Sequence, residues 1–325
     1  MSRVIWIVLL GACSLPEEAP LSEHVFAEPH MGTRITIKMW ADTPGRAERA
    51  AKAGFDVFRR LDALMSDYKP DSELSRLSDA AGSGPQAVSP ELYDVLVESK
   101  RIAERTGGAF DVTIAPVVLL WRKARKERAL PAPDVLQAAR AKVGHADLAL
   151  HQGRAELKRA GMRLDLGGIA KGYACDQALA AVAKEGVTRA YVDAGGGMSI
   201  GDPPPDRPAW RIGMIGDARR VLLLKNCGVA TAGDLEQFVE IEGRRYSHIV
   251  DPATGLGLTN RAMCTVVAPT GFAADAVDTA ICVLGAERGF ALGGFEAWMS
   301  WVEDGRVRSA ETPGFKALED QRSGP

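Results

Sequence analysis

The chain has 325 residues, of which 46% are apolar, enough to bury the core of one large domain or of two smaller ones. Its 40 basic and 42 acidic side chains give a formal net charge of −2 and are spread along the whole chain. Because no basic patch gathers anywhere in the sequence, nucleic acid is not expected as a partner.

The N-terminus predicts export. Residues 1–20 hold one arginine, a short apolar run over 4–10 and small residues before Cys13, the arrangement of a signal peptide. The stretch Leu-Gly-Ala-Cys at 10–13 resembles a bacterial lipobox. We therefore expect removal of residues 1–12, lipidation of Cys13 and a location on the periplasmic side of a bacterial membrane. The alternatives are a cleaved ordinary signal peptide and a frayed apolar start.

The next residues are expected to separate this anchor from the folded part. Residues 13–27 are rich in Pro, Glu and Ala and are predicted to form a tether, with one folded domain over 28–325. The cysteines after residue 13 lie far apart, without a C-x-x-C pair, and are predicted to be small buried residues. A disulfide among them stays an open alternative, because spacing does not report distance in the fold. These cysteines are Cys175, Cys227, Cys264 and Cys282.

The first elements of the domain are predicted by hydrophobic period. Apolar residues alternate with polar ones over 33–40, which is typical of a half-buried strand. Apolar residues at helical intervals predict one long amphipathic helix over 46–68. A second helix is expected after Ser89 as N-cap, with a stop at Gly107. The charged segment 121–133 ends in two prolines and is expected to be a surface excursion.

The second half of the chain is predicted to be richer in strands. Strands and hairpins are expected at 162–166, 189–196, 238–250, 263–269 and 296–310, with helices beginning near Ile169 and over 271–285. Strands that meet mostly through hairpins, with helices packed against them, predict an α+β fold. We expect a single compact domain with a mixed, mostly antiparallel sheet.

The stretch LDLGGIAKGYACD at 164–176 contains a glycine turn that leads into a predicted helix. Unpaired N–H groups and the positive end of the helix dipole at such a turn suit a phosphate, and Lys171 adds a cation. The spacing matches neither the dinucleotide-binding G-x-G-x-x-G nor the P-loop. The alternative is a tight strand-to-helix connection with a solvated lysine.

Two further stretches carry candidate chemical groups. In AADAVDTA, Asp275 and Thr279 lie four residues apart on one helical face, with Asp278 beside them. Their hard oxygens suit Mg²⁺, which completes its ligands with water, carbonyls and substrate phosphates. The alternative is a solvated helix start with Asp275 near the N-cap. In YSHIVDPATG, His248 and Asp251 stand at a strand end before a proline turn.

These three stretches resemble the FAD:protein FMN transferases, the ApbE family, in their order and approximate separations. Further matches to the family are MGTRITIKMW, LDALMSDYKPDSELSRLS, GGAFDVTIAPVV and GVATAGD, at 31–40, 61–78, 107–118 and 228–234. The resemblance covers nearly the whole chain after the N-terminal segment. Many ordered motifs make a specific signal, whereas each one alone is weak.

The resemblance implies a Mg²⁺-dependent enzyme that splits the pyrophosphate of FAD, transfers FMN to a threonine of an acceptor protein and releases AMP. The implied acceptors are flavoproteins of membrane electron-transfer complexes. The family's metal site maps onto the backbone of Gly168 and the side chains of Asp275 and Thr279. Its flavin contacts map onto Met31, Tyr68, Ala109, Phe110, Asp111, Asp165, Lys171, Ile249 and Val250.

The acceptor supplies the nucleophile in such a reaction, so this chain is expected to supply only a base. His248 is the first candidate and Asp251 the second; alternatively, His248 only orients the loop or binds FAD. Tyrosine at position 68 resembles the transferases, whereas asparagine there marks relatives that hydrolyse FAD to FMN and AMP. The chain departs from the family at Gly197, commonly Asn or Asp, and at Ala232, commonly Ser.

Two other functions compete with the transferase. An FAD pyrophosphatase of the same fold would make FMN and AMP without an acceptor. A noncatalytic flavin-binding lipoprotein would make neither product. Fold analogy alone does not separate the three, because one scaffold can host all of them.

Overall fold

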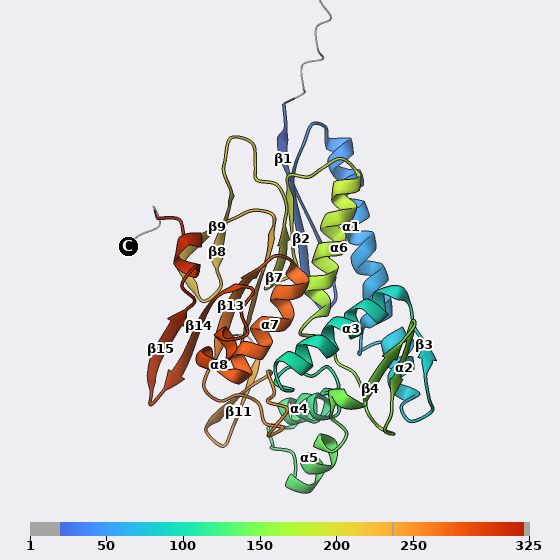
Figure 1. The fold of residues 1–325 in the computed structure, drawn as a ribbon. Coiled ribbons are helices and arrows are strands. Elements are labelled where there is room, and N and C mark those ends of the chain that lie inside the picture. Colours follow the sequence, from blue (N-terminus) through green and yellow to red (C-terminus); the bar gives the residue numbers. More distant parts are fainter. Residues whose placement is uncertain (1–19, 236, 322–325) are drawn as a thin grey trace, which may run out of the picture.

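An eight-stranded sheet forms the centre of the molecule (Figure 1), as seen in a computed structural model that describes residues 20–235 and 237–321. The strand order is β1-β2-β6-β7-β10-β13-β14-β15, and neighbouring strands are antiparallel. The predicted α+β class with a mostly antiparallel sheet is confirmed. The strands are β1 Ser22–His30, β2 Thr33–Ala41, β6 Ala190–Asp193, β7 Gly197–Ile200, β10 Cys227–Gly233, β13 Met263–Ala268, β14 Glu296–Glu303 and β15 Arg306–Glu311.

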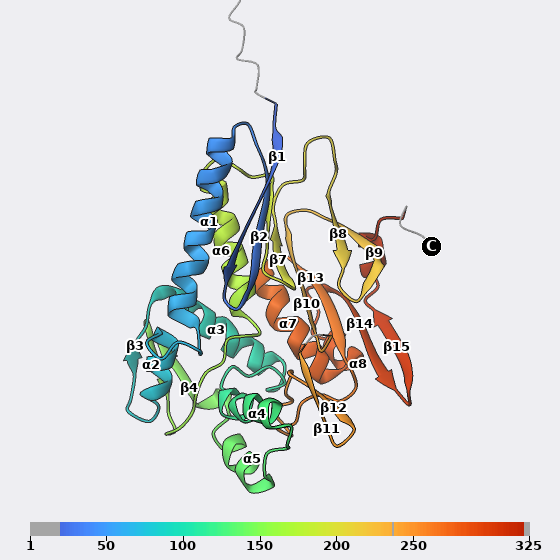
Figure 2. The same cartoon turned by 180° about the vertical axis from the view of Figure 1, so that it is seen from behind.

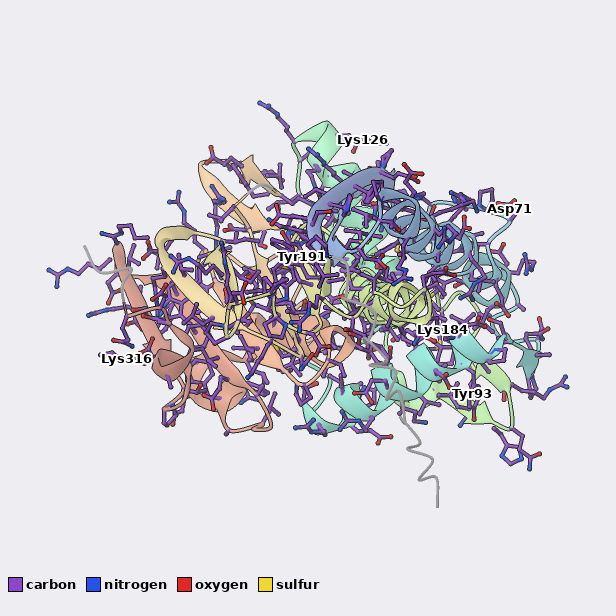
Figure 3. The ribbon with its side chains drawn as sticks, turned by 90° about the horizontal axis from the view of Figure 1, so that it is seen from above. Asp71, Tyr93, Lys126, Lys184, Tyr191 and Lys316 are labelled. Carbon is purple, nitrogen blue, oxygen red and sulfur yellow. The ribbon has the colours of Figure 1, made fainter. Side chains whose placement is uncertain are left out.

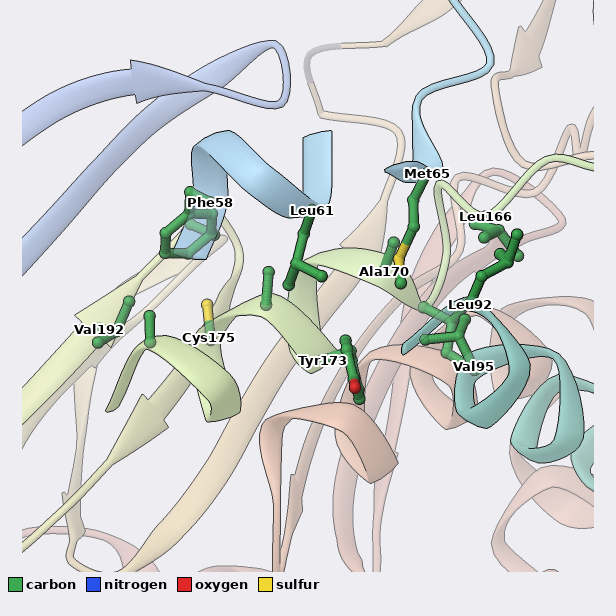
Figure 4. Packing of buried hydrophobic residues seen from close by; sticks show 14 of the residues in the cluster. Phe58, Leu61, Met65, Leu92, Val95, Leu166, Ala170, Tyr173, Cys175 and Val192 are labelled. Atoms are coloured by element: carbon green, nitrogen blue, oxygen red, sulfur yellow. The ribbon is translucent and has the colours of Figure 1, made fainter. Parts of the chain in front are cut away.

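Three helices, α1 (Pro44–Met65), α6 (Ala170–Lys184) and α7 (Gly271–Leu284), cover one face of this sheet (Figure 1). The alternating apolar residues of β2 point toward α1 and α6 and are fully buried. Figure 4 shows Phe58, Leu61 and Met65 of α1 packed toward Ala170 and Cys175 of α6. The predicted helix over 46–68 is confirmed, although it ends at Met65 rather than near Tyr68.

The other face of the sheet is covered by a separate hairpin and by the C-terminal segment (Figure 2). The hairpin consists of β8 (Trp210–Met214) and β9 (Asp217–Leu224), and the C-terminal segment forms the 3-10 helix η2 (Phe315–Leu318). The apolar side chains of both pack on the sheet, and Phe315 is fully buried. The central strands of the sheet are therefore covered on both faces, whereas the edge strands β1 and β15 are largely exposed.

Smaller elements form a lobe below the sheet (Figure 1). The helix α4 and the hairpin of β11 and β12 share one apolar cluster, which also contains part of α5. Seen from above, Asp71 near α2 and Lys316 in η2 lie on opposite sides of the molecule (Figure 3). The remaining elements are α2 Glu73–Asp79, β3 Gln86–Ala87, α3 Pro90–Arg105, α4 Ala115–Glu127, α5 Pro133–Arg140, η1 His145–Asp147, β4 Leu148–His151, β5 Arg154–Leu157, β11 Phe238–Ile241, β12 Arg244–Ser247 and α8 Ala286–Phe290.

Several positions at which helices and turns were expected are confirmed. Ser89 caps α3 by accepting a hydrogen bond from the backbone N–H of Leu92 at 3.3 Å. The hairpin turns Glu242-Gly243 and Asp304-Gly305 have the positive φ angles that such turns require. The predicted strand at 263–269 and helix at 271–285 appear as β13 and α7.

The predicted tether does not extend to residue 27. Residues 22–27 belong to β1, which pairs with β2 along its whole length, so the folded part begins before residue 28. Phe26 packs against the core that β2 and α1 share, which gives this edge strand an apolar anchor. The predicted signal peptide 1–12, Cys13 and the first part of the tether lie outside the described residues.

The segment 121–133 is not a surface excursion, because its first seven residues belong to α4. Trp121 and Ala124 are buried and form a narrow apolar stripe, while Lys123 between them is exposed. The indole N–H of Trp121 donates to the carbonyl of Gly255 at 2.8 Å, and its ring lies 5.2 Å from that of Tyr246. These contacts attach α4 to the β11–β12 hairpin.

The predicted strand at 162–166 is also wrong. Its described pairing is a single bridge between Arg163 and Ile114. The backbone N–H of Leu164 donates instead to the hydroxyl of Ser78, and that of Asp165 to the carbonyl of Val112. The segment is extended and buried, but side-chain and loop acceptors take the place of a neighbouring strand.

The cysteines in the described part of the chain are free thiols rather than disulfides. Burial raises the pKa of Cys175, Cys264 and Cys282 well above the ordinary range and that of Cys227 to about 11. The prediction of small buried residues is confirmed for the first three, and Cys227 is half-buried. None of the described helices combines the length and apolar character needed to cross a bilayer.

Candidate active site

The glycine turn before α6 is held from both ends. The carboxylate of Asp165 accepts the N–H of Gly167 at 2.8 Å, and the ammonium of Lys171 donates to the carbonyl of Gly167 at 2.9 Å. The helix begins without a side-chain cap at Ile169. An uncapped helix start beside a lysine is the arrangement that suits a phosphate.

Gly168 packs against the middle of α7. A Cβ at Gly168 would lie 3.3 Å from the hydroxyl of Thr279 and 3.3 Å from the ring of Phe110. The predicted metal positions Gly168 and Thr279 are therefore neighbours, and a side chain at Gly168 would enter the space between the turn and α7.

Asp275 lies one turn of α7 before Thr279 and is buried. Its Oδ2 accepts the backbone N–H of Gly172 at 2.9 Å, and its Oδ1 would lie 3.8 Å from a Cβ at Gly197. The alternative of a solvated helix start is wrong, since the N-cap of α7 is Thr270. Asp275 instead faces the start of α6 and Gly197 at the start of β7.

The site also contains a second buried acid. Burial and the neighbouring charge of Asp275 raise the pKa of Asp278 well above its ordinary range, and Lys171 opposes the shift. The hydroxyl of Thr279 donates to Asp278 at 3.1 Å. A buried cluster with this much negative charge favours a bound cation.

The donors fit Mg²⁺. No cluster of three His, Cys, Asp or Glu side chains suited to a metal occurs within residues 20–235 and 237–321. The carboxylate of Asp275, the hydroxyl of Thr279 and the backbone of Gly168 are hard oxygen donors that leave room for other ligands. Mg²⁺ is commonly held by one or two carboxylates and completed by water and substrate phosphates.

Asp176, to which the sequence assigned no role, fixes the start of α7. Its carboxylate accepts the backbone N–H groups of Gly271 and Phe272, each at 2.9 Å, and the hydroxyl of Ser199 at 2.5 Å. A carboxylate at a helix N-terminus satisfies its free N–H groups. Asp176 thus ties α6, β7 and α7 together next to Asp275. The only signal in the sequence was an acid among apolar residues of a helix.

His248 follows β12 and is half-buried. Its Nδ1 lies 3.1 Å from the carbonyl oxygen of Gln237, which can only accept, so Nδ1 carries the proton and Nε2 has the lone pair. Burial lowers the pKa of His248, with smaller contributions from the charges of Arg125 and Lys171. The hydrogen bond to Gln237 and the charge of Asp234 oppose this pKa shift without reversing it. The neutral form is therefore favoured, as a base requires.

The structure gives Asp251 and its neighbours other contacts. Both carboxylate oxygens of Asp251 are used within its own turn, by the N–H of Ala253 at 2.8 Å and the hydroxyl of Thr254 at 3.1 Å. Ile249 and Val250 are buried in two different apolar clusters. These residues shape the segment that carries His248.

The loop after α3 contributes one ring to the site. Phe110 is buried against Gly168, and Ala109 precedes it in the same half-buried loop. The carboxylate of Asp111 accepts from the N–H and hydroxyl of Thr113 and from the N–H of His145, at 2.7–2.9 Å. Asp111 therefore fastens this loop to the segment before β4.

Tyr68 lies just beyond α1 and is 75% exposed. The guanidinium of Arg122 lies 4.1 Å from the centre of its ring and pairs with Asp67 at 2.6 Å and Asp165 at 3.2 Å. Arg122 lies in the segment 121–133, whose charge and prolines predicted a surface excursion, so no role was expected for it. Met31 lies at the β1–β2 turn with a positive φ of 50° and packs against the core of α1 and α6.

The fold and the motifs were compared with known proteins. The ApbE family model matches residues 31–296, which include the candidate site residues from Met31 to Thr279. The chain belongs to the ApbE family. An ApbE relative from Treponema pallidum, named FAD:protein FMN transferase, is 32% identical and covers 89% of this chain and 86% of its own. One of the same name from Escherichia coli is 30% identical, covering 86% and 85%.

Solved ApbE structures share the fold. The flavin transferase ApbE from Vibrio cholerae superposes with a TM-score of 0.83 at 29% identity, covering 92% of this chain and all of its own. The flavinyl transferase ApbE from Pseudomonas stutzeri gives 0.81 at 28% identity, covering 92% and 97%. Of the two positions at which the resemblance implies a departure from the family, Gly197 lies beside Asp275, and Ala232 lies in β10, where its carbonyl is 3.8 Å from the thiol of Cys282 on α7.

Proposed function

We propose that this protein is an FAD:protein FMN transferase that attaches FMN to a threonine of an acceptor protein and releases AMP. The threonine oxygen attacks the FMN phosphorus, the bond to the bridging pyrophosphate oxygen breaks, and the threonine proton passes to a base. The observation that carries the proposal is the close packing of the Gly168 turn against Asp275 and Thr279, at an uncapped helix start. The names of the relatives support the same activity.

The residues of the turn bind the pyrophosphate in this proposal. The backbone N–H groups at the start of α6 and the ammonium of Lys171 offset its negative charge. Gly168, Asp275 and Thr279 hold Mg²⁺, which supplies further charge neutralisation at the pyrophosphate. Such transfers depend mainly on positioning and electrostatics, because the substrates supply the reacting atoms.

His248 is the proposed base. Its Nε2 has the lone pair, and its lowered pKa keeps the ring neutral near pH 7. The contacts of Asp251 within its own turn favour His248 over Asp251 for this role. His248 accepts the proton of the threonine as the oxygen attacks.

The acceptors we propose are threonine-bearing flavoproteins of membrane electron-transfer complexes. Lipidation of Cys13 would hold the enzyme on the periplasmic side of the membrane, where such acceptors face it. The support for this placement is the sequence pattern of residues 1–13. Loss of membrane attachment in Cys13→Ser, measured by fractionation, tests it; a Ser variant that stays in the membrane fraction contradicts it.

The activity is tested by intact-mass spectrometry of a threonine-bearing acceptor incubated with the protein, FAD and Mg²⁺, together with an AMP assay. We expect an FMN-sized mass gain on the acceptor, matched by AMP, and loss of both products with EDTA or in Asp275→Ala. Equal AMP release without any acceptor would indicate an FAD pyrophosphatase. No AMP at all would indicate a flavin-binding protein. The tyrosine at position 68 favours transfer over hydrolysis.

A further inference from the structure

We propose that Arg122 of α4 is a positioning residue that joins the flavin-contacting Tyr68 to the glycine turn that binds the pyrophosphate. This inference rests on the proposed function, because it concerns how the same site holds FAD. Nothing in the motifs of the sequence pointed to position 122. In the fold, its guanidinium contacts three side chains.

Arg122 uses the edge and the face of its guanidinium at the same time. Its Nη2 lies 2.6 Å from Asp67 and 3.2 Å from Asp165, and its face lies 4.1 Å from the centre of the Tyr68 ring. The side chain is only 21% exposed, so these contacts are partly shielded from water. A planar guanidinium can stack flat on a ring while its edge donates to carboxylates, whereas an ammonium has no planar face to stack.

Through Asp165, Arg122 is linked to the glycine turn. One oxygen of this carboxylate is paired with Arg122, and the other accepts the N–H of Gly167 at 2.8 Å. The ion pair therefore fixes the orientation of the carboxylate that orders the turn. A change at Arg122 is transmitted to the backbone that faces the pyrophosphate.

The contact with Tyr68 prepares a stacking surface. The tyrosine stands beyond the end of α1 and is 75% exposed, so little else restricts its ring. Arg122 lies over one face of the ring. A flavin that stacks on the other face meets a ring already held in place, and less rotamer freedom is lost on binding.

Removal of the Arg122 charge would leave two acids facing one another. Burial and the charge of Asp165 raise the pKa of Asp67, and Arg122 opposes that shift. Without the guanidinium, Asp67 and Asp165 repel each other, and Asp165 moves away from the turn. FAD then loses the fixed ring and the fixed turn together.

The test measures FAD affinity by quenching of flavin fluorescence, on the full-length protein with Mg²⁺ and no acceptor. Arg122→Met is expected to weaken FAD binding about tenfold, the scale of one charge-assisted, stacked contact, and Arg122→Lys is expected to weaken it by a smaller factor, because it keeps the charge but not the stacked plane. The expected kinetic signature in the transfer assay is a raised KM for FAD with a smaller change in kcat. Lys123→Met is the matched control, because Lys123 is a neighbouring cation on α4 that is 69% exposed.

A double-mutant cycle with Tyr68→Ala separates positioning from general stability. In that background Arg122→Met is expected to cost only about threefold in FAD affinity, because its action through the ring is gone. An unchanged tenfold loss there, or wild-type affinity in Arg122→Met, would overturn the inference. If Arg122→Met fails to fold, Arg122→Lys decides, since it keeps the charge between the two acids. A wild-type protein that neither binds FAD nor transfers FMN would overturn the proposed function itself.

Discussion

At the scale of single residues, His248 shows how one contact sets the chemistry of a ring. The Gln237 carbonyl accepts a hydrogen bond from Nδ1–H, so Nε2 has the lone pair, and burial disfavours the charged form. A histidine with this tautomer and a lowered pKa is neutral at a pH where an exposed histidine is partly protonated. Its basic nitrogen is available without prior loss of a proton.

We therefore expect the acid limb of the pH profile of kcat/KM for FMN transfer to have its midpoint below the ordinary histidine pKa of about 6.5. The sign follows from the role: a base works when neutral, so kcat/KM rises with pH through the pKa of the free enzyme, and a lowered pKa moves that rise to lower pH. The measurement is the pH profile of kcat/KM for FAD at saturating acceptor. An acid limb at or above 6.5, or one that persists unchanged in His248→Gln, contradicts the role as base.

Single residues also show what the sequence could reveal of the site. The i, i+4 spacing of Asp275 and Thr279 is a local property, so their shared face on α7 was predictable. The contacts of Arg122 and Asp176 are not local: each joins segments far apart in the chain. Nothing in their neighbouring residues reports those partners, and both roles became visible only in the fold.

At the scale of elements, the site depends on how closely α6 approaches α7. Gly172 lies at the contact, where an added Cβ would be 2.2 Å from the carbonyl of Gly271 and 2.7 Å from the Cβ of Asp275. The same approach brings the N–H of Gly172 to the carboxylate of Asp275. The contact between the two helices therefore positions both the glycine turn before α6 and the carboxylate of Asp275.

Gly172→Ala is expected to separate the two helices and to destabilise the protein by about 1–3 kcal/mol, the usual range for overpacking. The transfer rate should fall by more than the loss of stability alone would cause, because Asp275 loses the backbone N–H that it accepts from Gly172. Gly45→Ala is the control, since an added Cβ there meets only an arginine end at 3.8 Å in the first turn of α1. Thermal melts and transfer rates of both variants provide the measurement, and wild-type values for Gly172→Ala would contradict the argument.

Elements also explain why the local sequence pattern did not predict α4. The buried stripe of α4 is narrow, consisting mainly of Val117, Trp121 and Ala124, and charged residues cover the rest of its second half. Charge density and the following prolines favoured an irregular segment. The contact of Trp121 with Gly255, distant in sequence, stabilises the helix and was not visible in the local pattern.

At the scale of the whole molecule, the site is assembled from parts that lie far apart in the chain, among them the end of α1, the loop after α3, α4, the turn before α6, the middle of α7 and the segment after β12. Hairpin pairings such as β14–β15 were predictable, because their strands are neighbours in the chain. The pairings β2–β6 and β7–β10 join strands far apart in sequence and were not. The family resemblance indicated that these separate motifs belong to one site, which the local sequence patterns could not show.

The first strand makes a prediction for the molecule as a whole. A fragment starting at residue 28 lacks most of β1 and leaves β2 with an unpaired edge, whereas a fragment starting at residue 20 keeps the full sheet. We expect the shorter fragment to melt several degrees lower, at about 2–4 °C per kcal/mol lost, and to aggregate more readily. Equal melting temperatures and equal monodispersity in light scattering would show that residues 22–27 behave as the tether first expected.

The protected thiols of the described residues make the protein suitable for site-specific labelling. Thiolates are the species that alkylating reagents attack, and burial disfavours them at the four cysteines of the sheet and helices. In a chain carrying Cys13→Ser, a cysteine introduced for Lys123 would react first, beside Arg122 on the exposed side of α4. A fluorophore there would lie one residue from Arg122, a position from which FAD binding can be followed without a tag on the acceptor.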